Sequence, residues 1–570
     1  MRGFSGKKAA PAKAPAKVVR PKPKLDPVKV IFDAEFYLAT YPDVADTGLT
    51  PLEHYRTIGR GELRQPSPLF DPVWYLERNA DVARNKVEPL GHFLRNGGKE
   101  GRDPIPFGFD SRWYRAQHPE IGTANPLVHY LAKGAALGYQ PSPHFDSAWY
   151  KSEYLGESTE SPLVHYLRFG REQGKRPSKR GNAEGNVDQL MAQRFEILQP
   201  LRTIPGENVP RLNLVTDAIG PDTLFGGVAT ALVLAILWAE RSGRRLRIVT
   251  RYPSPDTSGL AALYASIGIE AAEEPELATI SCIPGDYLEV GDGDIFLTTS
   301  WWTTSATLKV VPAERVTHIL QEDERLFYPI GTWWLWAAQT MNTPGLTVVV
   351  NTSNLLQHLV TSGIDNLATT GISFEPSFTS FLRPGRTLAQ GEKRQLFFYA
   401  RPANPRNLFD VGVLALDKAI ENGWLPTSDW ELHFVGRHLP EFVFCDETAP
   451  IHHTNLDWAQ YHDLLATIDL GLSLMSSPHP SYPPLDLAAS GSVVVTNSWP
   501  GKPDLTAVSK RLVVAEPTVD ALAEAIRDAV AQVEAVREEP FVPNPTPYFN
   551  SWRQNFAPVL DHLDERFGRV

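Results

Sequence analysis

The apolar and polar positions of this chain follow two different rhythms, which change near residue 180. In the first part, a Phe-Asp pair recurs at intervals of 38, 39 and 36 residues. Each pair is followed by an aromatic-Tyr step, a Pro-Leu step, a His beside an aromatic residue, and a Gly. The pairs begin at Phe32, Phe70, Phe109 and Phe145. A period of about forty residues indicates a supersecondary unit copied in tandem, so residues 28–178 are predicted to hold four repeats.

Each repeat is predicted to contain two short helices stacked as a helical-hairpin solenoid. The Asp of each Phe-Asp pair is placed to cap the first helix, and the Pro begins the second helix. The Gly of each repeat is expected to stop that helix. The recurrent His is expected to pack in the core, with a ring nitrogen bonded to a carbonyl, rather than to bind a metal. The array carries no catalytic constellation and is predicted to bind a protein partner or a glycan.

From Arg211 onward, buried strands alternate with amphipathic helices. The predicted strands are Leu212–Thr216, Leu246–Thr250, Asp294–Thr299, Val316–Leu320, Val348–Asn351, Leu396–Tyr399, Leu432–Val435, Leu470–Met475 and Val493–Thr496. Two consecutive β/α sets predict an α/β fold with two doubly wound domains that face each other across a cleft. We place these domains at 209–385 and 386–545, after a linker at 179–208. Residues 546–570 are predicted to form a helix that crosses back to the first domain.

Four motifs follow predicted strands, where ligands bind in such folds. Gly226-Gly227 leaves backbone amides free for an anion, although a tight turn explains the glycines equally well. Glu322, Asp323 and Glu324 form an acidic loop that could supply a general base or remain merely solvated. Arg401 and Arg406, with Asn407, suit a pyrophosphate, the alternative being surface arginines.

The fourth motif is the most specific one in the chain. It runs from Ser476 to Gly491 and joins a Pro-rich loop to a helix whose first turn contains Asp486. Its candidate donor-binding residues are Ser477, His479, Ser481, Tyr482 and Asp486. The Asp292-Gly293-Asp294 sequence mimics a metal-binding DxD, but it precedes a strand and is better explained as a turn. We therefore expect no metal and no cofactor.

Composition and charge exclude several classes of function for this chain. The chain has 570 residues, a formal net charge of −11 and two cysteines without metal or redox spacing, which fits a reducing compartment. Residues 1–27 are rich in Lys, Ala and Pro, and are predicted to be a disordered basic tail that either contacts an anionic membrane weakly or only aids solubility. The acidic remainder argues against nucleic acid. The longest apolar run, Val228–Ala239, is too short to span a bilayer, so we expect a cytoplasmic protein, peripheral at most to the inner face of the inner membrane.

Residues 211–570 resemble the GT-B glycosyltransferases of family 4, most nearly the rhamnosyltransferases that build bacterial surface glycans, including the S-layer glycan enzyme. The loops 321–329 and 477–484 carry that resemblance. It implies that Arg401 and Arg406 hold the donor diphosphate and that Asp486 bonds the donor ribose. Pro478 stands where the family has a sugar-contacting Glu. The repeats resemble modules attached to glycosyltransferases in alphaproteobacteria.

The resemblance implies transfer of a sugar, such as L-rhamnose from dTDP-rhamnose, to a growing glycan or lipid-linked acceptor. The first domain would hold the acceptor through Gly226, Gly227, Trp301 and Trp302, with the acidic loop supplying catalytic carboxylates. Because Pro478 replaces the expected Glu, an inactive GT-B scaffold that recruits partners through its repeats is the alternative. Hydrolysis of the donor is the second enzymatic possibility.

Overall fold

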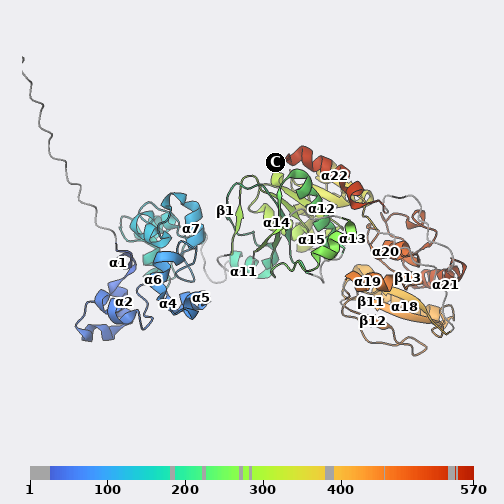
Figure 1. The fold of residues 1–570 in the computed structure, drawn as a ribbon, viewed down its shortest axis with the longest axis horizontal. Coiled ribbons are helices and arrows are strands. Elements are labelled where there is room, and N and C mark those ends of the chain that lie inside the picture. Colours follow the sequence, from blue (N-terminus) through green and yellow to red (C-terminus); the bar gives the residue numbers. More distant parts are fainter. Residues whose placement is uncertain are drawn as a thin grey trace, which may run out of the picture. The chain divides into compact units, whose positions relative to one another are not determined.

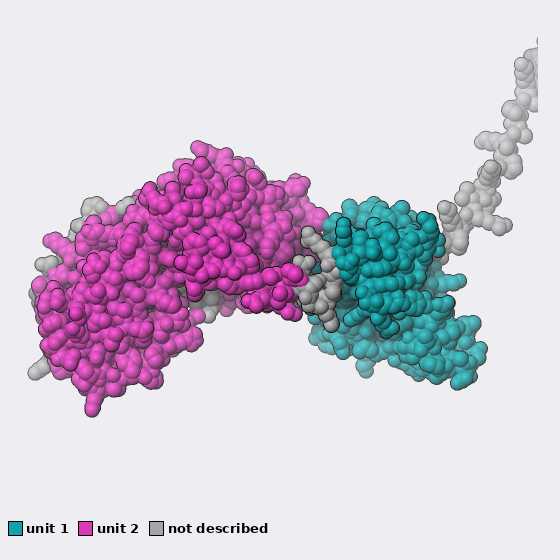
Figure 2. All heavy atoms as spheres, turned by 180° about the vertical axis from the view of Figure 1, so that it is seen from behind, with its two compact units in different colours: residues 1–186 teal, residues 187–570 magenta. Residues whose placement is uncertain are grey.

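The computed structural model describes residues 26–179, 187–220, 226–268, 274–280, 286–378, 391–454, 456, 458–536, 546, 548 and 550–570. It divides into two compact units at Asn186 and Val187, coloured separately in Figure 2. The predicted basic tail lies almost entirely outside the described residues, as do Cys282 and residues 221–225 of the first glycine motif.

The first unit consists of short helices (Figure 1). Its α-helices are α1 Pro27–Ile31, α2 Ala34–Thr40, α3 Pro51–His54, α4 Pro72–Arg78, α5 Ala80–Arg84, α6 Pro89–His92, α7 Ser111–Gln117, α8 Pro126–His129, α9 Ser147–Tyr150 and α10 Pro162–His165. Five π-helical turns extend them: η2 Tyr55–Gly59, η3 Phe93–Gly97, η5 Tyr130–Gly134, η6 Lys151–Leu155 and η7 Tyr166–Gly170. The 3₁₀ turns are η1 Pro42–Thr47 and η4 Pro119–Ile121.

The capping prediction is confirmed in all four repeats. The carboxylates of Asp33, Asp71, Asp110 and Asp146 accept backbone N–H bonds from the first turns of α2, α4, α7 and α9. The backbone N–H of each Asp also donates to the carbonyl of a proline about 32 residues later in the chain, as from Asp33 to Pro66 at 3.0 Å. One residue therefore both starts the first helix and closes its repeat.

The repeated glycines have a different role from the predicted helix stop. Gly59, Gly97, Gly134 and Gly170 end π turns, and the residue after each one is still right-handed helical. A Cβ on Gly97 would lie 2.0 Å from the Tyr75 hydroxyl, and the other three positions meet the equivalent Tyr at 2.2–2.3 Å. Glycine is required because a tyrosine side chain passes directly over the backbone.

The recurrent histidines have a packing role, as predicted, but their bonding partner differs. His54 is buried and the other three are half-buried. Nδ1 of His54, His92, His129 and His165 lies 2.9–3.1 Å from the hydroxyl of a Tyr in the first helix of the same repeat. The partner is thus a side chain and not a carbonyl. The repeats also form a closed array rather than an open solenoid, since Arg168 of the fourth repeat donates to Glu35 of the first at 2.7 Å.

The second unit contains two parallel sheets, each with helices on both faces. The first has the order β4-β3-β2-β6-β7-β8-β9 and the second β12-β11-β10-β13-β14-β15. The strands are β2 Arg211–Thr216, β3 Arg245–Thr250, β4 Glu276–Thr279, β6 Ile295–Thr298, β7 Val316–Leu320, β8 Thr347–Asn351, β9 Gly371–Phe374, β10 Arg394–Tyr399, β11 Trp430–Val435, β12 Ile451–His453, β13 Leu470–Leu472, β14 Val493–Asn497 and β15 Leu512–Ala515. A separate parallel pair joins β1 Thr203–Pro205 to β5 Leu288–Val290. This is the predicted GT-B architecture.

The helices of this unit are α11 Val187–Arg194, α12 Gly227–Ser242, α13 Leu260–Ile267, α14 Trp301–Leu308, α15 Thr332–Met341, α16 Ser353–Thr361, α17 Leu367–Thr370, α18 Phe409–Glu421, α19 Trp458–Leu465, α20 Pro483–Ala489, α21 Val519–Val536 and α22 Trp552–Phe567. The central strands are buried along their whole length because helices cover both faces. The C-terminal helix α22 packs on α12 in the first sheet's core through Phe556, Val559 and Leu563, which confirms the predicted crossing.

Candidate active site

A cavity of about 550 Å³ lies between the two sheets of the second unit. The loops that line it follow the carboxyl ends of strands in both sheets, as expected for ligand sites in doubly wound folds. From the first sheet's side come Gly226, Gly227, Gln321, Glu322 and Phe327. From the second sheet's side come Arg401, Arg406, Asn407, His479, Ser481, Tyr482 and Asp486.

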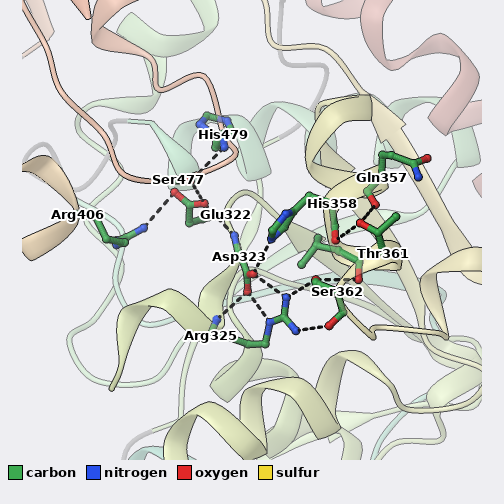
Figure 3. Close-up of polar contacts among 11 residues, drawn as sticks. Glu322, Asp323, Arg325, Gln357, His358, Thr361, Ser362, Arg406, Ser477 and His479 are labelled. Atoms are coloured by element: carbon green, nitrogen blue, oxygen red, sulfur yellow. Dashed lines mark hydrogen bonds and ion pairs between the residues drawn. The ribbon is translucent and has the colours of Figure 1, made fainter. Parts of the chain in front are cut away.

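Glu322 and Arg406 join the two sides of the cavity (Figure 3). The Arg406 guanidinium donates to Oε2 of Glu322 at 3.1 Å, and the Ser477 hydroxyl donates to Oε1. The Arg406 guanidinium also lies over the Phe327 ring, 4.4 Å from its centroid. Burial raises the pKa of Glu322 and lowers that of Arg406, while each charge partly offsets the shift of the other. The acidic loop and the arginine motif therefore meet in one ion pair.

The Pro-rich loop is held by its own polar groups and presents a histidine to the cavity. The backbone N–H of His479 donates to Ser477 Oγ at 3.0 Å, and the N–H of Ser481 donates to Nδ1 of His479 at 3.0 Å. Because Nδ1 accepts, the ring proton is on Nε2. This Nε2 is buried and has no hydrogen-bond partner among the described residues. Burial, helped by Lys502 and Arg406, lowers the pKa of His479 to about 3, so the ring is a neutral donor at physiological pH.

Tyr482 ties the same loop to the first sheet. Its hydroxyl accepts a bond from Asn351 Nδ2 at 2.7 Å and lies 3.1 Å from Thr230 Oγ1 and 3.3 Å from Gln321 Oε1. Gly226, at the start of α12, has φ +53° and lies against the Tyr482 ring. A Cβ here would lie at an ordinary 3.5 Å from that ring, so glycine is favoured by the positive φ rather than by lack of space.

Asp486 occupies the second sheet's side of the cavity at the start of α20. The Tyr461 hydroxyl donates to its Oδ2 at 3.3 Å. Burial raises the pKa of Asp486 to about 7, although the Tyr461 bond opposes this shift. A half-protonated carboxyl of this kind both donates and accepts hydrogen bonds, which suits sugar hydroxyls.

Two further cations accompany Arg406. Arg401 lines the cavity and is exposed, with Nη1 3.3 Å from the Tyr399 hydroxyl. Lys502 was missed by the sequence analysis. Its Nζ donates to the Asn497 carbonyl at 3.0 Å, and burial lowers its pKa to about 8. Lys502 belongs to no sequence motif. It is recognised only in the structure, where it follows β14 and lies near Glu322.

The structure corrects the acidic loop. Asp323 does not line the cavity; Arg325 binds both of its oxygens at 2.7–2.8 Å, and His358 lies 3.3 Å away. Glu324 accepts the backbone N–H of Trp301 at 2.5 Å and lies 3.7 Å from His318 Nε2. Both carboxylates are buried structural partners, so Glu322 alone of the three remains a candidate for chemistry.

The two tryptophans are also structural. Trp301 is fully buried and its Nε1 donates to the Tyr328 hydroxyl at 3.2 Å. Trp302 donates to Asp217 at 2.7 Å. Neither lines the cavity, because they pack with Phe195 and Trp333 in a separate aromatic cluster. Their acceptor role stays a prediction; Trp302 approaches the cavity only through Phe327, whose ring centroid lies 6.3 Å from its own.

Asp294 of the DxD-like sequence is fully buried and pairs with Arg247 at 3.2 Å, which fits the predicted turn. Within the described ranges, no group of three or more His, Cys, Asp or Glu side chains is placed to hold a metal ion. In that same part of the chain, no helix combines the length and apolar character that crossing a membrane requires.

Parts of this chain match known proteins. Residues 211–354 match the WsaF N-terminal domain, and residues 394–527 match the WsaF C-terminal domain. Both sides of the cavity therefore resemble WsaF. The O-antigen biosynthesis protein RfbC of Myxococcus xanthus is 32% identical over 324 residues, which cover 54% of this chain but only 23% of RfbC.

Solved structures that match this chain include Anabaena Alr3699/HepE in complex with UDP and glucose, at 12% identity and a TM-score of 0.42. WaaG, a glycosyltransferase involved in lipopolysaccharide biosynthesis, has 15% identity and a TM-score of 0.38. Each match covers 63% of this chain and the whole of the other chain.

Proposed function

We propose that the second unit is a glycosyltransferase that moves a sugar from a nucleoside-diphosphate donor to a bacterial surface polysaccharide. The observation that carries this proposal is the cavity between two doubly wound sheets, into which two arginines, a neutral histidine N–H and a buried carboxyl are directed. The matches to both WsaF domains and to an O-antigen biosynthesis protein support the same class.

The chemistry follows from the charges. A diphosphate leaves more easily when cations neutralise it, and Arg401, Arg406 and Lys502 supply them. His479 Nε2 and the Asn407 amide add neutral polar contacts, and Asp486 bonds hydroxyls of the donor. The proposal includes independence from a metal ion, since these groups do the neutralising. The acceptor approaches from the side of Gly226 and Gly227.

For the donor we propose dTDP-L-rhamnose, on the resemblance to family 4 rhamnosyltransferases in the loops 321–329 and 477–484. The acceptor is a growing or lipid-linked glycan at the inner face of the inner membrane. The repeats would hold a partner protein or the glycan itself, since their recurrent His and Tyr side chains bond each other within each repeat and offer no catalytic set.

A second candidate, an inactive sugar-binding scaffold, is favoured by one observation. Pro478 stands where a sugar-contacting carboxylate is expected, and the nearby Glu322 is engaged by Arg406 and Ser477. Binding of a nucleotide sugar without turnover would establish this alternative.

The test is release of nucleoside diphosphate from dTDP-rhamnose, dTDP-glucose, UDP-glucose and GDP-mannose, with and without bacterial polysaccharide acceptor. We expect release from one donor, stimulated by the acceptor, unaffected by EDTA and lost in Arg401→Ala. Release that ignores the acceptor would indicate hydrolysis. Release that stops with EDTA and returns with Mg²⁺ would contradict metal independence.

A further inference from the structure

Glu322 is bonded to the same hydrogen-bond donors that an anionic ligand would need. Its carboxylate comes from the first sheet's loop, yet it accepts bonds from Arg406 and Ser477 of the second sheet's side. A guanidinium and a hydroxyl directed at one point are also the donors that bind a phosphate oxygen. The carboxylate and a phosphate cannot occupy these donors together, because two anions in a buried site repel each other strongly.

We propose that, in the free protein, the Glu322 carboxylate occupies the position of a ligand phosphate on Arg406 and Ser477, and that a nucleoside-diphosphate ligand displaces it and leaves it protonated. This inference rests on the proposed function. It assigns to Glu322 the role of an internal competitor for the donor site, a role different from the general base that the sequence suggested.

Protonation follows from what Glu322 retains after displacement. Its third bond is the backbone N–H of Asp323, at 2.9 Å. Without Arg406 and Ser477, the carboxylate would be a buried anion beside a diphosphate. Burial already raises the pKa of Glu322, and Arg406 opposes the rise. When a diphosphate takes over Arg406, Glu322 faces an anion instead of a cation, which favours its neutral acid form.

The other titratable groups around Glu322 determine which control variants the experiment needs. On its own loop, Asp323 is neutralised by Arg325 and Glu324 is bound to the Trp301 N–H. From the second sheet's side, His479 stays neutral because its pKa lies near 3. Lys502 has a pKa near 8 and can itself gain a proton when an anion binds. Asp486, whose pKa is about 7, also lines the cavity. Lys502 and Asp486 are therefore the competing sources of any proton uptake.

The first experiment is calorimetric titration of the full chain with dTDP-glucose and UDP-glucose, in which the two phosphates keep a constant charge near neutral pH. We expect Glu322→Gln to bind about tenfold more tightly than wild type, since a neutral amide competes less for Arg406. The matched control, Glu524→Gln on an exposed face of α21, should bind like wild type. Equal or weaker binding by Glu322→Gln would overturn the inference.

Proton uptake gives a second, independent readout on wild type. Titrations in two buffers of different ionisation enthalpy should show net proton uptake on binding, and affinity should rise as the pH falls from about 8 to about 6. Lys502→Met should keep this uptake and Glu322→Gln should lose it. Uptake that persists in Glu322→Gln would overturn the inference, whether Lys502 or Asp486 is then its source.

The two proposals fail differently. Binding of a nucleotide sugar to wild type, without proton uptake and with the same affinity in Glu322→Gln, would remove the role of Glu322 and leave the donor site intact. No binding of any nucleotide sugar to wild type or to Glu322→Gln would overturn both.

Discussion

The repeats and the cavity use histidines in opposite ways. In the first unit, the Nδ1 atom of each recurrent histidine bonds the tyrosine of its own repeat. In the second unit, Nδ1 of His479 is fixed by a backbone N–H, and its buried Nε2 has no hydrogen-bond partner among the described residues. An unsatisfied buried donor costs stability, so its retention points to a ligand. The comparison separates polar groups that hold the fold from those that await a binding partner.

The largest expected effect concerns the ion pair across the cavity. Arg406→Ala leaves Glu322 buried without its cation, and should lower the free energy of unfolding of the second unit by about 3 kcal/mol at neutral pH. Adding Glu322→Gln should restore most of that loss, because the uncompensated charge is then gone. Urea denaturation of the single and double variants measures both values. Equal stability of the single and double variants would show that the unpaired Glu322 charge does not cause the loss.

The next effect tests the glycines of the repeats. Gly97→Ala places a methyl group against the Tyr75 hydroxyl and should destabilise the first unit by about 3 kcal/mol. Gly61→Ala is the matched control, since its nearest atom would be a carbonyl oxygen at an ordinary 3.4 Å. Thermal unfolding followed by circular dichroism compares them. A similar melting temperature for the two variants would contradict the close approach of the tyrosine.

A smaller effect tests the open donor in the cavity. His479→Asn keeps an acceptor near the position of Nδ1 for the Ser481 N–H but removes the Nε2 donor. We expect nucleotide-sugar affinity to fall about tenfold with little change in unfolding free energy. Calorimetry measures the affinity and urea denaturation measures the free energy of unfolding on the same samples. A loss of stability without a loss of affinity would place His479 with the structural histidines.

The smallest effect concerns the paired donors of the repeats. Tyr75→Phe removes the hydroxyl that bonds His92 at 2.9 Å, and should cost about 1 kcal/mol. Nucleotide-sugar affinity should not change. A fall in affinity would show that the first unit shapes the donor site.

Much of this arrangement could be predicted from the sequence. Strands such as Val493–Asn497 and Thr347–Asn351 contain runs of valine, and the Asp N-caps recur at a nearly fixed interval, so local chemistry identifies both. Strands at or next to the sheet edges, such as β4 and β12, were missed because they are short and partly exposed. The glycine role was mistaken because a tyrosine 22 residues away in sequence, as Tyr37 is from Gly59, decides it.

The candidate site was predictable as a set of loops but not as a set of bonds. The sequence pattern places Arg406 and Ser477 in loops that follow strands. It does not predict that both bind Glu322, because Glu322 belongs to the other sheet. The same limit explains Asp323, Glu324 and Trp301, whose neighbours in space make them structural. Lys502 lies outside every motif and is found only by its position near the cavity.

The most direct test of the central claim is a thermal-shift panel of dTDP, UDP, GDP and their sugar conjugates with wild type and Arg401→Ala. Arg401 is exposed, and among the described residues its side chain has a hydrogen bond with Tyr399 alone, so its loss should spare the fold. The account predicts stabilisation by one nucleotide and its conjugates, absent in the variant. No stabilisation of wild type by any nucleotide would contradict a nucleotide-sugar site in this cavity.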